Sequence, residues 1–282
     1  MTGSRLLGWV RAISYLAFTF ATMPIQALAL VFHASSAAER IPLRYHAICA
    51  RLLGFRVIVR GTPSQVRPTL FVANHTSYFD IILLASLVEC SFIAKADMIS
   101  WPLIGWLARL QRSVFVDRKP TNVDEHRSEV ARRLAEGDNL VLFAEGTTSD
   151  GNRLLPFKSS LFSVAERHRS DLPLTIQPVS IVATGLDGMP LGRTLRPLYA
   201  WYGDMPLLPH AWAAIKSGLI TVEVEFHEPM TNENMSRKEL AEKCRIEVEA
   251  GFLRSITGRA VAGAEAADAH YEEKAAAIEA AA

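Results

Sequence analysis

Apolar residues form one long stretch near the N-terminus, followed by short runs that alternate with helical patterns. The long stretch spans Ala12–Phe32, and no formal charge falls between Arg11 and Glu39 when histidine is neutral. At about 1.5 Å per residue a helix of this length reaches roughly 31 Å, close to a hydrocarbon core of about 30 Å. Pro24, near its middle, favours a kink.

This apolar stretch admits several interpretations. A cleaved signal peptide fits poorly, because the run exceeds the usual apolar region of about 7–15 residues and no clear A-x-A site ends it. Another interpretation, which needs no membrane, is a helix buried in the core of the protein. A kinked transmembrane helix and a re-entrant or interfacial pair of half-helices stay equally open, and both put the protein on a membrane.

Basic residues gather after the apolar stretch rather than before it. Because positive charge accumulates near cytoplasmic ends, we expect an inner-membrane protein with its larger C-terminal part on the cytoplasmic side. The same side chains could rest on anionic headgroups. The arginines that follow the stretch are Arg40, Arg44, Arg51, Arg56 and Arg60.

Beyond Gly54, short apolar runs predict strands at 55–59, 69–73, 91–94, 113–116, 139–143, 174–183, 195–201 and 219–226. Helical spacing predicts helices at 78–88, 101–110, 123–136, 157–168 and 236–253, the last with a capping box of Ser236 and Glu239. The alternating apolar and acidic residues of 219–226 are typical of a half-buried edge strand.

Strands separated by helices predict an α/β fold, with a mixed, largely parallel sheet flanked by helices behind an N-terminal membrane helix or helical hairpin. We divide the chain into a membrane-associated helical segment (1–53), a catalytic domain (54–256) and an Ala/Glu-rich tail (257–282), which we interpret as a frayed helix or disordered.

Composition excludes several classes of protein. Charged residues make up 21% and the mean hydropathy is +0.15, which argues against wholesale disorder. Thirty basic and 29 acidic residues leave a net charge of +1, so nothing indicates a nucleic-acid partner. Three cysteines without close spacing form no zinc or C-x-x-C motif and fit a reducing compartment.

The block 74–80 carries the first candidate chemistry. It follows a buried strand and opens a helix, the place where α/β enzymes hold reactive groups. His75 and Asp80 form an H-x4-D pattern, in which the turn can fold the carboxylate onto the imidazole. Such a pair can serve as a general base. The alternative is a helix cap formed by Ser77 or Asp80 beside an incidental histidine. Since the chain holds no G-x-S-x-G motif, we expect the nucleophile to be a hydroxyl of the substrate.

The second block, 143–151, leaves the most apolar strand through a glycine-containing loop. A carboxylate at a strand's C-terminal end, here Glu145 beside Gly146, is typical of a site. The alternative is a turn whose Asp, Ser and Thr side chains bind their own backbone.

Together the two blocks resemble the glycerolipid acyltransferase superfamily, of the PlsC (lysophosphatidic acid acyltransferase) type. That family has an N-H-x4-D block and an F-P-E-G-T-R-like block, and here 70 residues separate His75 from Glu145. Two further blocks match: the region from Lys95 to Arg118 and the apolar, proline-containing strand 176–181. The resemblance covers about residues 70–182.

The resemblance implies a fold and a set of roles. It implies a glycerol-3-phosphate acyltransferase-like fold that transfers a fatty acyl group from acyl-ACP or acyl-CoA to the hydroxyl of a lysolipid, with no cofactor and no metal. His75 would be the base and Asp80 its orienting partner. Arg118 would bind an acceptor phosphate. Glu145, Gly146, Thr147 and Thr148 would shape the acceptor site.

The sequence departs from the family pattern within the second block. Ala144 stands where the family has proline, and Thr148 where it has arginine, which removes one expected phosphate contact; Arg153 or Lys158 could replace it. Segments 148–153 and 201–205 resemble the branch of bacterial lyso-ornithine lipid acyltransferases. We take 1-acyl-sn-glycerol-3-phosphate as the default acceptor and lyso-ornithine lipid as the alternative. A lipid-binding or lipid-transfer module without chemistry is the alternative of another class.

Overall fold

The fold is described from a computed structural model of the chain, which describes residues 3–32, 35–101, 103–116, 123–166 and 174–258. The helices are α1 (Arg5–Val31), α2 (Ser35–Leu53), α3 (Phe79–Ala85), α4 (Ile104–Leu110), α5 (Val123–Ala135), α6 (Ser163–Glu166), α7 (Leu207–Ile215) and α8 (Arg237–Thr257). Three short 3₁₀ helices are η1 (Ala96–Ser100), η2 (Ser159–Phe162) and η3 (Arg196–Leu198).

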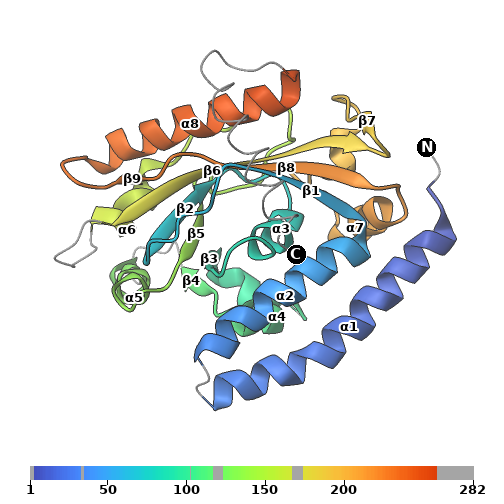
Figure 1. Cartoon of the computed structure of the whole chain (residues 1–282), viewed down its shortest axis with the longest axis horizontal. Coiled ribbons are helices and arrows are strands. Elements are labelled where there is room, and N and C mark those ends of the chain that lie inside the picture. Colours follow the sequence, from blue (N-terminus) through green and yellow to red (C-terminus); the bar gives the residue numbers. More distant parts are fainter. Residues whose placement is uncertain (1–2, 33–34, 102, 117–122, 167–173, 259–282) are drawn as a thin grey trace, which may run out of the picture.

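A mixed, mostly parallel sheet forms the centre of the domain, as the sequence predicts (Figure 1). Its order is β1-β8-β6-β2-β5-β3-β4, with β7 and β9 paired to β6; within this path β6 and β8 are antiparallel to each other and the other neighbours are parallel. The strands are β1 (Phe55–Arg60), β2 (Thr69–Ala73), β3 (Ser91–Lys95), β4 (Val114–Val116), β5 (Leu140–Phe143), β6 (Thr175–Leu186), β7 (Met189–Pro190), β8 (Ile220–Phe226) and β9 (Met230–Thr231).

Strand β2 is buried on both faces, which explains its continuous run of apolar side chains. Phe71 and Ala73 point into the core shared with α2, α3 and α7, whereas Leu70 and Val72 point into the core shared with α5, α6 and α8. Helix α8 therefore covers one face of the sheet and α2 and α3 the other (Figure 1). This packing fixes the end of β2, from which the candidate site begins.

Two strand predictions are wrong. Segment 219–226 is not an edge strand: β8 lies between β1 and β6. Its acidic residues bind arginines there, Glu223 with Arg60 at 3.6 Å and Glu225 with Arg254 of α8. Segment 195–201 is no strand; its middle forms η3, and Pro197 within it has no N–H to offer a sheet.

Two other predictions change in detail and extend beyond the described residues, and a third is confirmed. The helix predicted at 157–168 is the pair η2 and α6, and its end lies outside the described residues. Helix α8 ends at Thr257 with Gly258 in a left-handed conformation (φ 64°), and the rest of the predicted tail lies outside the described residues. The capping box of Ser236 and Glu239 is present.

Helix α1 is continuous through Pro24 and forms a hairpin with α2, so the alternative of two half-helices within the apolar stretch is not observed (Figure 1). By length and composition it is the one helix among the described residues that could cross a membrane. Within its most apolar window only 17% of the residues are buried. The alternative of a buried core helix is therefore wrong.

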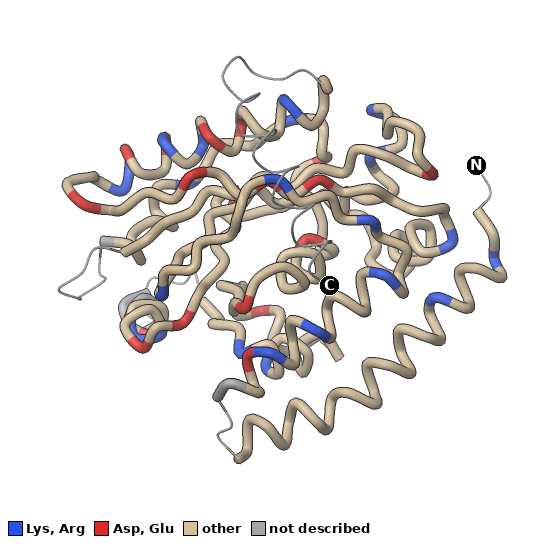
Figure 2. The backbone as a smooth tube through the Cα atoms, in the orientation of Figure 1, with Lys and Arg blue, Asp and Glu red and all other residues tan. Residues whose placement is uncertain are grey.

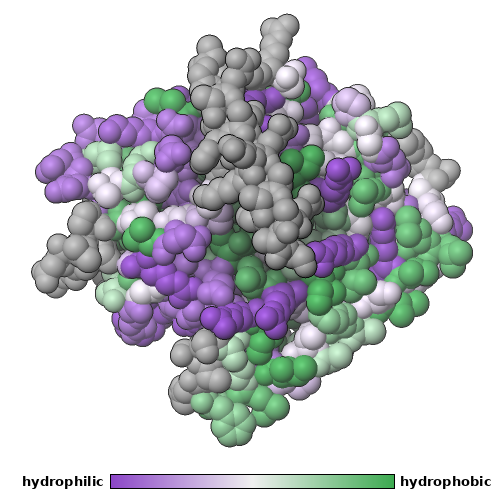
Figure 3. All heavy atoms as spheres, viewed as in Figure 1, coloured by the Kyte–Doolittle hydropathy of each residue, from purple (hydrophilic) through white to green (hydrophobic). Residues whose placement is uncertain are grey.

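Helix α1 turns polar residues inward and apolar residues outward. Thr19 bonds the Tyr45 hydroxyl at 2.9 Å, and Gln26 donates to the carbonyls of Ala38 and Leu110, each at 2.9 Å. The tube of α1 carries charge only towards its N-terminus, and apolar surface gathers along the hairpin (Figures 2 and 3). Its exposed large apolar residues are Leu6, Trp9, Val10, Ile13, Leu16, Phe20, Ile25, Leu28 and Val31.

Both ends of α1 contact the rest of the protein. Near its start, Trp9 packs on Trp212 of α7 with ring centroids 4.9 Å apart. Arg11 donates to three carbonyl oxygens at 2.8–3.0 Å, one at the last residue of α7 and two just after it. Near its end, Gln26 bonds Leu110 of α4. The helix therefore lies along the domain instead of projecting from it.

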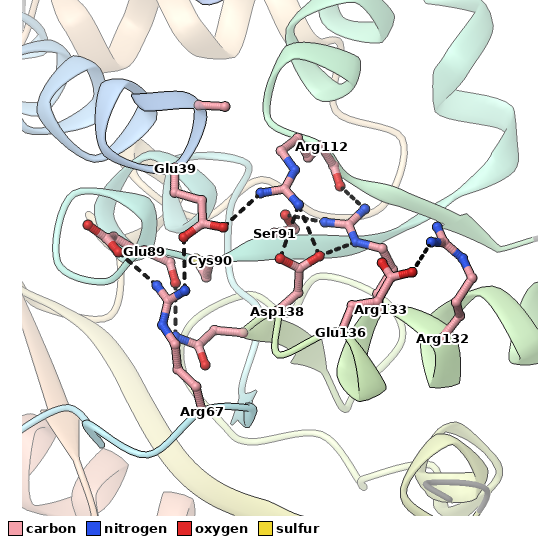
Figure 4. Close-up of polar contacts among 12 residues, drawn as sticks. Glu39, Arg67, Glu89, Cys90, Ser91, Arg112, Arg132, Arg133, Glu136 and Asp138 are labelled. Carbon is pink, nitrogen blue, oxygen red and sulfur yellow. Dashed lines mark hydrogen bonds and ion pairs between the residues drawn. The ribbon is translucent and has the colours of Figure 1, made fainter. Parts of the chain in front are cut away.

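An ion-pair network fastens α2 to the domain (Figure 4). Glu39 accepts from Arg67 at 2.8 Å and from Arg112 at 3.2 Å. Arg67 also binds Glu89, and Arg112 binds Asp138. Because single exposed pairs are worth little and connected ones more, the network matters chiefly through linking α2 to the turns before β2, β3 and β5.

Replacing Arg11 tests how the hairpin is held. Arg11→Met removes the guanidinium that satisfies the carbonyls of Ile215, Ser217 and Gly218, so we expect a loss of about 1.5–3 kcal/mol in the free energy of unfolding in detergent. Arg5→Met, at an exposed position of the same helix, is the control and should be close to wild type. Equal stability of the two variants would contradict this account.

Candidate active site

The candidate site lies where two parallel strands end side by side. Ala73 of β2 pairs with Phe143 of β5, so the residues two positions further on, His75 and Glu145, come together at the carboxyl edge of the sheet. The His75 backbone N–H donates to Glu145 Oε1 at 3.2 Å. The Phe143 ring stacks on the His75 imidazole, with centroids 3.8 Å apart and planes 14° apart.

Asp80 organises this edge. Its Oδ2 accepts from His75 Nδ1 at 2.8 Å and from the backbone N–H groups of Thr76 and Ser77 at 2.7 and 2.9 Å. Its Oδ1 accepts from the Tyr199 hydroxyl at 2.5 Å. The side chain is fully buried, so every one of these bonds is shielded from water.

These bonds decide the tautomer of His75. An ionised carboxylate can only accept hydrogen bonds, so the 2.8 Å contact places a proton on Nδ1 of His75 and leaves the lone pair on Nε2. The imidazole side chain is 17% exposed, whereas Asp80 is not exposed at all. The arrangement can therefore take a proton from a group in the adjoining cavity while Asp80 stabilises the resulting imidazolium.

Glu145 has a different environment from Asp80. Burial, with the nearby negative charge of Asp80, raises the pKa of Glu145 to about 8, although the His75 N–H opposes the rise. Glu145 does not line the cavity. Its Oε1 accepts the backbone N–H of His75, so Glu145 supports the turn that carries the imidazole.

Two loops are fastened to the backbone beside His75. The Ser149 N–H donates to the His75 carbonyl and the Trp201 N–H to the Thr76 carbonyl, both at 2.9 Å. Gly146 turns the first loop with a positive φ of 65°, a conformation that suits glycine. The loops thus bring segments 146–148 and 201–204 to the same cavity.

This cavity has a volume of about 720 Å³ and a lining that is mainly apolar. His75 and Tyr78 line it, together with side chains of α1, α2 and α4. A cavity of this size and character suits an aliphatic chain whose end reaches the imidazole.

The structure brings most of the predicted site residues together. His75 and Asp80 are bonded, Gly146, Thr147 and Thr148 line the cavity, and Glu145 lies behind them. Arg118 lies outside the described residues. Arg153 and Lys158, considered as replacements for the missing arginine, are exposed and are not among the described residues that line the cavity.

Sequence reasoning missed Tyr199. It placed this residue inside a strand, whereas Tyr199 is fully buried beneath the site and donates to Asp80. Burial among apolar groups raises the pKa of its hydroxyl, which therefore stays a donor. Pro197 in an otherwise strand-like run was the pattern that could have argued against a strand.

Among the described residues, no group of three or more His, Cys, Asp or Glu side chains is placed to hold a metal ion.

Comparisons with known proteins agree with this geometry. The family model described as Acyltransferase matches residues 56–182. A lyso-ornithine lipid O-acyltransferase of Brucella abortus is 44% identical over 79% of this chain and 85% of its own length. One from Rhizobium meliloti is 40% identical over 84% of each chain.

More distant relatives carry another name. A 1-acyl-sn-glycerol-3-phosphate acyltransferase of Neisseria gonorrhoeae is 32% identical over 66% of this chain and 69% of its own length. The crystal structure of the PlsC acyltransferase from Thermotoga maritima shares the fold, with a TM-score of 0.56 and 23% identity over 89% of this chain and 99% of that one.

The chain therefore belongs to the glycerolipid acyltransferase superfamily of the PlsC type and is an O-acyltransferase. This confirms the expected family, fold class and kind of enzyme. It does not favour the default acceptor, because the relatives of highest identity given above are named for the alternative one.

The raised pKa of Glu145 predicts how stability depends on pH. Between its ordinary pKa of 4.5 and about 8 the folded chain binds a proton that the unfolded chain has lost, so stability falls as pH rises through this window. The isosteric Glu145→Gln variant has no carboxyl proton to lose in this pH window. Relative to this variant, wild type should lose stability from pH 5 to pH 8, with a slope of up to about 1.4 kcal/mol per pH unit.

Urea unfolding at several pH values measures this difference. Glu233→Gln, at an exposed position away from the cavity, is the control and should follow wild type. Parallel curves for wild type and Glu145→Gln would mean that Glu145 is not held protonated.

Proposed function

We propose that this enzyme transfers a fatty acyl group from an acyl thioester, acyl-ACP or acyl-CoA, to the free hydroxyl of a lyso-ornithine lipid. The observation that carries this proposal is the identity of 40–44% over most of the length of two relatives with that name. Thr148 in place of the expected arginine supports it, because a phosphate acceptor would lose a cation there.

His75 acts as the general base in this proposal. Its Nε2 takes the proton of the acceptor hydroxyl as the oxygen attacks the thioester carbonyl. A C–O bond forms, the C–S bond breaks, and the imidazolium returns the proton to the departing thiolate. Asp80 remains a carboxylate throughout and holds the imidazole, itself held by Tyr199 and two backbone N–H groups.

The acyl chain of the donor occupies the apolar cavity between His75 and the α1–α2 hairpin. Hence the cavity excludes water from the reacting carbonyl, which disfavours hydrolysis of the thioester.

The hairpin sets the protein on the inner membrane from the cytoplasmic side. Because both ends of α1 contact the domain, the helix lies within one leaflet and does not span the bilayer. Its outward apolar residues enter the lipid, and the exposed arginines Arg40, Arg44 and Arg51 of α2 meet anionic headgroups. A lysolipid can then reach the cavity without leaving the membrane.

Replacement of the two bonded residues tests the mechanism. His75→Ala should lower kcat by about 10²–10⁴-fold, the usual contribution of a positioned acid–base group. Asp80→Asn should also lower kcat, because an amide can hold the wrong tautomer. Turnover of acyl-ACP in vesicles measures both, and His227→Gln, a buried histidine outside the cavity, should keep near-normal turnover. A folded His75→Ala enzyme with wild-type kcat would refute the mechanism.

A competition assay tests the acceptor. Purified enzyme receives lyso-ornithine lipid and 1-acyl-sn-glycerol-3-phosphate in one vesicle with acyl-ACP, and in parallel with acyl-CoA. We expect a higher kcat/KM for lyso-ornithine lipid, and a preference for the phosphate acceptor would overturn the proposal. Thr148→Arg should raise use of the phosphate acceptor by about tenfold or more. Ser160→Arg, exposed and outside the cavity lining, controls for net charge.

A further inference from the structure

Among the described residues, the charged side chains that line the cavity beside His75 belong to exposed residues at its rim. Among the described lining residues, the side chains with a formal charge at neutral pH are Lys95, Asp97 and Asp204, and all three residues are exposed. One lysine against two aspartates leaves a net charge of −1. The described part of the rim is therefore acidic, whereas the interior is mainly apolar.

An acidic rim discriminates between the two kinds of acceptor. A phosphate monoester carries a charge of about −1.5 to −2 at neutral pH, so two carboxylates beside it are repulsive. Ornithine has two amino groups and one carboxyl group. Acylation of one amine leaves the other as an ammonium, and an ammonium is attracted to a carboxylate.

The loop that carries Asp204 is fixed relative to the candidate base. The Trp201 N–H bonds the carbonyl of Thr76, the residue after His75, at 2.9 Å. The Trp201 indole N–H closes the loop on the Met205 carbonyl at 2.7 Å, and Gly203 makes the turn with a φ of 59°. Asp204 is thus presented at the rim by a loop pinned to the catalytic block.

Aromatic rings add to the attraction at this rim. Tyr78 and Trp201 both line the cavity and meet edge to face, with centroids 5.7 Å apart. Aromatic faces attract an ammonium through the ring quadrupole and do not attract a phosphate. The Asp204 carboxylate and the rings of Tyr78 and Trp201 together favour a cationic group of the lipid headgroup. This group would lie on the side of the cavity formed by the 201–205 loop.

We propose that Asp204 determines acceptor specificity by binding the ammonium group of a zwitterionic aminoacyl lysolipid, beside the rings of Trp201 and Tyr78. The inference rests on the proposed function, since it assigns a residue to the headgroup of that acceptor. Asp204 takes no part in proton transfer. It positions the headgroup, so its contribution appears in KM and kcat/KM more than in kcat.

The test combines removal of the carboxylate with removal of the ammonium. Asp204→Asn should lower kcat/KM for lyso-ornithine lipid by about three- to twentyfold, between the values for an exposed and a buried charge pair, mainly through KM. With a lyso-ornithine lipid whose free amine is acetylated, wild type and Asp204→Asn should be equal. Asp204→Glu, which keeps the charge, should retain most of the activity.

Two control variants sharpen the result. Glu233→Gln makes the same change of net charge outside the cavity and should behave as wild type with both acceptors. Asp97→Asn removes the other acidic group of the rim and should have the smaller effect.

The outcomes separate the two proposals. If wild type acylates lyso-ornithine lipid but Asp204→Asn has unchanged kcat/KM, or loses the same factor with the acetylated acceptor, the inference is wrong and the proposed function stands. A larger loss in Asp97→Asn than in Asp204→Asn also overturns the assignment. If wild type uses only the phosphate acceptor, the proposed function fails, and this inference fails with it.

Discussion

One buried carboxylate holds together the edge of the sheet that carries the candidate site. Asp80 binds the imidazole of His75 and the two backbone N–H groups between them, so a single side chain fixes the turn and the tautomer at once. Tyr199 occupies its remaining oxygen. Because a buried charge without partners is costly, the turn after β2 can be stable only in the conformation that presents His75. The geometry of the candidate base is therefore tied to folding as well as to the proposed chemistry.

In the N-terminal hairpin, polar side chains of α1 face inward and apolar ones face outward, the reverse of the usual arrangement around a protein core. Thr19 and Gln26 of α1 face the domain, where they find the Tyr45 hydroxyl and backbone carbonyls, while large apolar side chains face outward. Water would penalise that arrangement and lipid would not. The same hairpin supplies part of the cavity wall beside His75, which joins the proposed membrane attachment to the site where a chain must enter.

The sequence predicts most of the sheet and the pairing of His75 with Asp80, because both depend on local sequence patterns. Buried parallel strands such as β2 and β5 show as unbroken apolar runs, and H-x4-D is a local turn. The rest depends on contacts distant in sequence. Tyr199 meets Asp80 across 119 positions. Strand β8 lies inside the sheet because both β1 and β6 pair with it, and its acidic residues bind Arg60 and Arg254 there. Alternation alone cannot distinguish an acid facing water from one facing an arginine.

In the proposed function, the choice of acceptor follows from where charge is placed in a mainly apolar cavity. An acyl chain can be bound by any sufficiently large apolar wall, so the interior says little about the headgroup. The rim is different, since a carboxylate there attracts one class of headgroup and repels another. Thr148 lacks the charge that a phosphate needs, and Asp204, on the other loop pinned beside His75, adds a charge that a phosphate avoids. In this proposal, the two loops bonded to the consecutive residues His75 and Thr76 favour the same headgroup by different means, one by lacking a cation and the other by supplying an anion.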